Sequence, residues 1–99
     1  MGRFEVKTDA DCVLWLSGEL DMAVAAEFAA TAASVLDGQR ELVLDLTQLD
    51  FLDSSGIRAI VDTAMRTDRG VLLRGPKPNV RRAIDITGIV GQRGIVLEP

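Results

Sequence analysis

Histidine is absent from this sequence of 99 residues, and cysteine occurs once, at position 12. A catalytic triad of serine, histidine and aspartate and a cysteine–histidine pair are therefore both excluded. Zinc coordination by cysteine and histidine is excluded as well, and a single cysteine cannot form a disulfide within the chain. Cys12 precedes the apolar run Val13-Leu14-Trp15-Leu16. This favours a buried apolar role for Cys12 over a reactive thiol.

Long apolar runs and an excess of basic residues are also missing. No apolar run reaches the ~18 residues of a membrane span, and the N-terminus lacks the charged and then apolar pattern of a signal peptide. The formal net charge is −4 at pH 7, whereas nucleic-acid binding needs a basic surface. We therefore expect a cytoplasmic protein that binds neither nucleic acid nor membrane.

Phosphate-binding loops of two common kinds are absent too. Neither G-x-x-x-x-G-K-S/T nor a G-x-G-x-x-G following a strand occurs. The carboxylates of Asp21, Asp45, Asp50 and Asp53 could gather at one end of a sheet and hold Mg²⁺ with a nucleotide. Aspartates at strand ends more often cap helices or form turns. The sequence thus predicts a binding protein rather than an enzyme, with no catalytic, cofactor-binding or metal-binding residues.

The order of apolar patterns predicts the fold class. Hydrophobic residues make up 47% of the chain, which suffices for one core in one domain over residues 1–99. The patterns follow the order strand, strand, helix, strand, helix, strand, helix, strand. Such alternation predicts an α/β fold with a mixed, largely parallel sheet of about five strands, covered by three crossover helices.

Individual elements follow from spacing and from residues that start or end them. The run Val13–Leu16 predicts a strand covered on both faces that ends at Gly18. Asp21 is predicted to cap a helix that starts at Met22 and ends at Gly38. Other strands are expected at Phe4–Val6, Leu42–Leu46, Val71–Leu73 and Ile95–Leu97, and other helices from Ile57 to Gly70 and from Pro78 to Gly88.

The most informative stretch lies between the predicted central strand and the helix that follows it. Here Asp53-Ser54-Ser55-Gly56 falls at the start of a helix, where backbone N–H groups lack partners and the helix dipole is positive. A helix cap at Asp53 or Ser54 alone would explain part of this pattern. Two adjacent hydroxyls exceed what a cap needs, so one can point outward and be modified.

A phosphate on that hydroxyl would act as a switch. It would add about −1.5 to −2 charges at pH 7 beside Asp53 and Asp21, while the helix N-terminus would tolerate it. A partner that accepts the neutral serine would be repelled. A penalty of ~3 kcal/mol weakens binding more than a hundredfold, without refolding the domain.

Four segments give the chain a family resemblance. The most specific is Leu44–Gly56, and the others are Gly18–Asp21, the pair Gly75-Pro76 with Val80-Arg81-Arg82, and Ile86–Ile89. In this order they resemble a STAS domain, in particular the stand-alone anti-sigma factor antagonists of bacteria. Many members have a further helix after the last strand. The given sequence ends directly after that strand, and without such a helix we expect part of one sheet face to be exposed.

The resemblance implies a mechanism and partners. An unmodified antagonist binds an anti-sigma factor that is also a serine kinase and so frees a sigma factor, for example in a stress response. The kinase then phosphorylates the antagonist and releases it, and a serine phosphatase reverses this. The match places the phosphoacceptor at Ser55. It places the partner-binding residues at Asp21, Asp53, Ser54, Ser55, Gly56, Ile57 and Arg58.

Several alternatives remain beside this interpretation. Arg58 either contacts the partner or begins a surface ladder with Asp62 and Arg66, and the ladder is the expected one. The chain is expected to be a monomer or a weak dimer. The alternative function is a soluble STAS subunit of a lipid or anion transport complex without a phosphoswitch. A nucleotide-binding domain that uses the clustered carboxylates is a third alternative, which calorimetry with GTP or ATP and Mg²⁺ would test.

Overall fold

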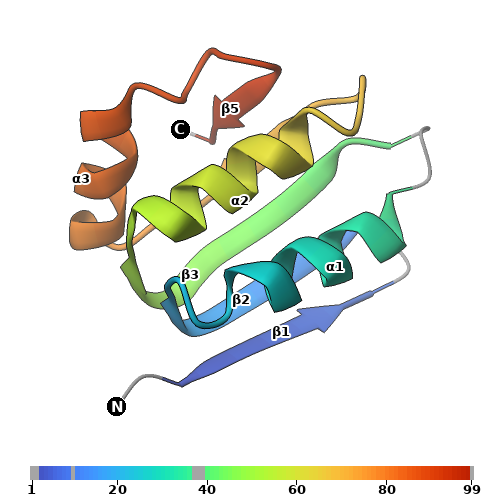
Figure 1. Ribbon diagram of the computed structural model, residues 1–99. Helices are drawn as coiled ribbons and strands as arrows, with labels where there is room; N and C mark the ends of the chain where they lie inside the picture. Colours follow the sequence, from blue (N-terminus) through green and yellow to red (C-terminus); the bar gives the residue numbers. More distant parts are fainter. Residues whose placement is uncertain (1–2, 10, 37–39, 99) are drawn as a thin grey trace.

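The computed structural model describes residues 3–9, 11–36 and 40–98 and has the predicted order of elements (Figure 1). In chain order these are β1 (Phe4–Thr8), β2 (Val13–Leu20), α1 (Ala25–Val35), β3 (Leu42–Leu52), α2 (Ser54–Ala64), β4 (Val71–Arg74), α3 (Pro78–Thr87) and β5 (Ile95–Leu97). No helix in the described ranges is long and apolar enough to cross a bilayer.

The strands form one sheet in the order β1-β2-β3-β4-β5. Only β1 runs antiparallel to its neighbour, and the other three pairs are parallel. Each parallel pair is joined through a helix, and α1 and α2 lie side by side across one face (Figure 1). The predicted α/β class with a mixed, largely parallel sheet is confirmed.

The core lies between the helices and one face of the sheet. Leu14, Leu44 and Ile95 from the strands and Phe28 and Ile60 from the helices are fully buried in one cluster. Cys12 is 2% exposed and its thiol donates a hydrogen bond to the Val35 carbonyl at 3.1 Å. The predicted buried role of this cysteine is confirmed.

The second strand differs from its prediction in two ways. Trp15 is 38% exposed, so the run is not covered on both faces. Its side chain alternates with the buried Leu14 and Leu16 and so points away from the core. The strand also continues through Gly18 to Leu20. Glycine permits this, because position 18 has a φ of +86° and a side chain there would collide with the Arg3 carbonyl.

Two helices also depart from their predicted ends. Asp21 does not cap α1, which begins at Ala25. The Asp21 carboxylate instead accepts a hydrogen bond from the Ala23 N–H at 3.0 Å, which forms a turn before the helix. The predicted end at Gly38 lies outside the described residues. The helix α2 stops at Ala64 rather than at Gly70, whereas α3 begins at Pro78 and is closed by Gly88 as expected.

Candidate functional site

Two irregularities in β3 set the position of the candidate site. From Val43 to Leu52 this strand pairs with Val13 to Leu20 of β2, so β3 uses two more residues than its neighbour over the same length. The register shifts between the partners of Trp15 and Ser17 and again between those of Gly18 and Glu19. Each shift is a bulge that redirects the side chains after it.

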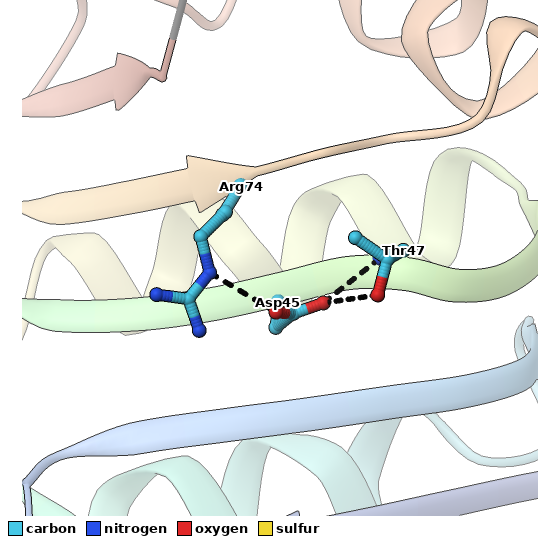
Figure 2. A network of polar contacts seen from close by, with 3 residues as sticks. All are labelled: Asp45, Thr47 and Arg74. Atoms are coloured by element: carbon cyan, nitrogen blue, oxygen red, sulfur yellow. Dashed lines mark hydrogen bonds and ion pairs between the residues drawn. The ribbon is translucent and has the colours of Figure 1, made fainter.

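The first bulge is held by a polar network around Asp45 (Figure 2). One carboxylate oxygen accepts hydrogen bonds from the N–H of Thr47 at 3.0 Å and from its hydroxyl at 2.6 Å. The other oxygen accepts from Nε of Arg74, on the neighbouring strand, at 3.0 Å. Asp45 is only 8% exposed, and each of its oxygens has a partner.

Two opposing effects act on the pKa of Asp45. Burial disfavours the carboxylate and by itself raises the pKa. The hydrogen bonds from Thr47 and the ion pair with Arg74 act the other way and outweigh burial, so the pKa lies below its ordinary value of 3.8. Asp45 is therefore ionised at neutral pH and belongs to the fold rather than to an acid–base site.

The second bulge is tied to the start of α3. Asp50 forms an ion pair with Lys77 through its carboxylate, and its backbone carbonyl accepts a hydrogen bond from the Asn79 side chain at 2.6 Å. These contacts satisfy a backbone group at a point where the strand ladder is irregular. They fix the end of β3, from which the candidate site follows. The sequence reasoning did not single out Lys77 or Asn79.

Asp21 and Asp53 each directly follow the last residue of a strand, and these two last residues are paired in the sheet. Leu20 pairs with Leu52 in parallel register, and the N–H of Asp53 donates to the Leu20 carbonyl at 3.3 Å. The Asp53 carboxylate accepts a hydrogen bond from the Gly56 N–H at 2.9 Å. Asp53 rather than Ser54 is therefore the N-cap of α2.

Gly56 allows α2 to start close to the sheet. A Cβ on this residue would lie 2.6 Å from the Leu20 carbonyl oxygen and 2.7 Å from Cδ1 of Leu52. Both Gly56 and the next residue, Ile57, are buried. Of the seven residues predicted to bind a partner, these two therefore support the surface from beneath.

The two serine hydroxyls are not used by the fold. Ser54 is exposed, while Ser55 is half-buried and lines an open groove of about 260 Å³ between α1 and α2. Within the described residues neither hydroxyl makes a hydrogen bond, and the cap of α2 is supplied by Asp53. A reagent from solution can thus reach the wall of the groove where Ser55 lies.

The predicted ladder of Arg58, Asp62 and Arg66 does not form. No ion pair joins these residues in the part of the chain that the structure describes. Side chains on a helix lean toward its N-terminus, so Arg58 leans away from Asp62, and this order of charges is the weaker one. Arg66 lies beyond the end of α2, where its N–H bonds to the Thr63 carbonyl in a turn.

The carboxylates proposed as Mg²⁺ ligands have separate uses. Asp45 pairs with Arg74 and Asp50 with Lys77, and Asp21 and Asp53 each accept a backbone N–H. Across residues 3–9, 11–36 and 40–98 no three acidic or cysteine side chains come together in a way that could hold a metal ion. The geometry does not favour the alternative of a carboxylate–nucleotide site.

Two exposed apolar residues border the same end of the sheet. Met22, which follows Asp21, is 78% exposed, and Phe51, near the end of β3, is 45% exposed. The sequence reasoning missed both. A large apolar residue next to a strand-end aspartate is the signal that could have found Met22.

Comparison with known proteins identifies the family. The model described as "Mlab, STAS domain" matches residues 4–98, and the chain belongs to the STAS domain family. It is 35% identical over 88 residues to a protein of Bordetella bronchiseptica named "Putative anti-sigma factor antagonist BtrV", a match that covers 85% of this chain and 76% of that protein.

Solved structures agree with this assignment. An anti-sigma factor antagonist from Mycobacterium paratuberculosis is 29% identical with a TM-score of 0.78, covering 100% of this chain and 86% of that one. Two others establish the fold. One, described as a "putative anti-sigma factor antagonist" from Thermotoga maritima, is 21% identical with a TM-score of 0.69, over 95% of this chain and 84% of that one. SpoIIAA in its unphosphorylated form is 18% identical with a TM-score of 0.68, over 98% and 89%.

Proposed function

We propose that this protein is an anti-sigma factor antagonist whose binding is switched off by phosphorylation of Ser55. The relatives from Bordetella and Mycobacterium named as antagonists support the general role. The observation that carries the switch is local. Asp53 caps α2 by itself, so the hydroxyl of Ser55 is left without a structural task at the wall of an open groove.

In this proposal the unmodified surface around the start of α2 binds an anti-sigma factor that is also a serine kinase. The surface comprises Asp21, Asp53, Ser54, Ser55 and Arg58, which lie at or near the solvent. The exposed side chains of Met22 and Phe51 add apolar area at its edge. Gly56 acts from below by setting how closely α2 approaches β2, and the buried Ile57 anchors the same turn of α2 in the core.

The modification transfers the γ-phosphoryl group of ATP to the oxygen of Ser55. The bond to the β-phosphate oxygen breaks, ADP leaves, and the hydroxyl proton passes to a base of the kinase. The product carries about −1.5 to −2 additional charges next to the Asp53 carboxylate. A partner that packs against neutral Ser55 is then repelled, and a serine phosphatase restores the binding form.

Incubation with the cognate kinase and ATP tests the proposal. Intact-mass analysis is expected to show one added phosphoryl group on the parent protein and on Ser54→Ala, and none on Ser55→Ala. The Ser54→Ala variant is the matched control because it removes the neighbouring, more exposed hydroxyl. Modification of Ser55→Ala to the same extent as the parent would overturn the assignment of the site.

Copurification from the native host separates this function from the alternative. An anti-sigma factor recovered with the unmodified protein supports the proposal. A transport ATPase or permease recovered in its place would favour a soluble subunit of a transport complex, in which Ser55 needs no modification.

A further inference from the structure

The groove between α1 and α2 contains one cation and one anion. Its lining residues are Ala25, Ala26, Ala29, Ser55, Arg58, Ala59 and Asp62. The α1 side contributes only alanines, so Arg58 and Asp62, both on α2, are the charged side chains that line it. Ser55 and Arg58 therefore line the same open groove.

Spacing and direction bring Arg58 toward Ser55. The two residues lie three positions apart on α2, and residues at this spacing have Cβ atoms ~5–6 Å apart. Helical side chains lean toward the N-terminus, which aims the long Arg58 side chain at the turn that carries Ser55. Arg58 forms no ion pair within the described chain, although Asp62 follows it by one turn.

We propose that Arg58 is the internal partner of a phosphate on Ser55. This inference rests on the proposed function, because it takes Ser55 as the phosphoacceptor. The planar guanidinium can bind phosphate oxygens through two parallel N–H groups. The charged groups around the phosphate are Arg58, the Asp62 carboxylate farther along the groove, the capping Asp53, and Asp21 at the neighbouring strand end.

The pairing makes the switch act on two groups at once. In the unmodified protein Arg58 is exposed and available to an acidic group of the partner. After phosphorylation the same guanidinium is held by the phosphate in the groove. The modification thus adds negative charge and also removes a cation from the surface that the partner contacts.

Phosphoserine placed at position 55 during translation tests the pairing without a kinase. The probe is the phosphate itself, followed by ³¹P NMR during a pH titration. An exposed phosphoserine has a second pKa of about 6, and a nearby cation lowers it. We expect Arg58→Gln to raise this pKa by roughly 0.5 or more relative to the parent phosphoprotein, and Arg58→Lys to recover part of the difference.

The matched control is Arg66→Gln, which removes a cation beyond the end of the same helix. It is expected to leave the phosphate pKa within about 0.2 of the parent value, because an exposed charge that distant is screened. Equal pKa values for the parent and Arg58→Gln would overturn the proposal. An equal rise of the phosphate pKa in Arg58→Gln and Arg66→Gln would overturn the proposal too, since such a rise would report only the change in net charge.

The outcome is distinguishable from failure of the proposed function. If the phosphoprotein still binds the anti-sigma factor as tightly as the unmodified protein, the switch is contradicted. The effect of Arg58→Gln on the phosphate pKa does not depend on that result. Conversely, an unchanged phosphate pKa in Arg58→Gln removes the pairing while release by phosphorylation can still occur.

Discussion

Asp45 and Asp53 belong to the same strand and its continuation, yet their surroundings are opposite. Asp45 is nearly buried, and both of its oxygens are bound by Thr47 and Arg74. Asp53 is half-exposed and uses one oxygen to cap α2, beside two serines whose hydroxyls have no partner in the described structure. At Asp45 both carboxylate oxygens are bound, and these contacts fix the strand. Beside Asp53 the backbone is fixed by neighbouring groups, and the serine hydroxyls stay available for modification.

The difference shows how a fold can tolerate a change of charge at one point. At Asp45 any added group would break several contacts at once. At Ser55 the cap and the close packing are supplied by Asp53 and Gly56, so a modification need not disturb them. Substitutions can separate the two regions.

Gly56→Ala is expected to have the largest effect on stability. The added methyl group would lie 2.6 Å from the Leu20 carbonyl oxygen, so α2 or β2 must shift. Overpacking of this kind typically costs about 1–3 kcal/mol of unfolding free energy. Urea unfolding measures the loss, with Ser54→Ala as the control at a neighbouring exposed position. A Gly56→Ala variant as stable as the parent would show that the close approach is not needed.

Asp45→Asn tests the closed site and its pH dependence. Loss of the charge weakens the contacts with Arg74 and Thr47, which we expect to cost about 1.5 kcal/mol at pH 7. Because the folded pKa of Asp45 lies below its ordinary value of 3.8, its contribution is complete above that value. The contribution is lost as the pH falls through the folded pKa.

Urea unfolding at a series of pH values checks this sign. The stability gap between the parent and Asp45→Asn should be constant near neutrality and shrink below about pH 4. Asp62→Asn is the control, because this exposed carboxylate has no ion-pair partner in the described chain. A gap that widens toward low pH would contradict the assigned pKa direction.

Asp53→Ala tests the cap, with a smaller expected effect. Loss of an aspartate N-cap costs about 1 kcal/mol, whereas Ser55→Ala should change the unfolding free energy by less than about 0.5 kcal/mol. The same urea experiment compares the two. If Ser55→Ala destabilised as much as Asp53→Ala, the serine would share the cap and would not be a spare hydroxyl.

The order of elements was predictable because apolar spacing and breaker residues are local. The period of Ile57, Ile60 and Ala64 defines α2, and Pro78 and Gly88 mark α3. The bulges of β3 were not predictable, since they depend on pairing with β2 and on side chains from β4 and α3. The exposure of Trp15 likewise depends on where the crossover helices pack.

Parts of the site were accessible to sequence reasoning for the same reason. A cap at Asp53 or Ser54 and one spare hydroxyl in the serine pair follow from a few adjacent residues, whereas the choice of Ser55 rests on the family resemblance. The absence of the Arg58–Asp62–Arg66 ladder could be predicted only with the direction of the side chains and the true end of α2 at Ala64. The groove lined by Ser55 and Arg58 could be predicted only from the placement of α1 beside α2.

A calorimetric titration of the cognate anti-sigma factor with two forms of this protein, unmodified and phosphorylated at Ser55, tests the phosphoswitch directly. We predict a Kd at least about a hundredfold weaker for the phosphorylated form, which corresponds to ~3 kcal/mol. Equal affinity of the two forms would contradict it.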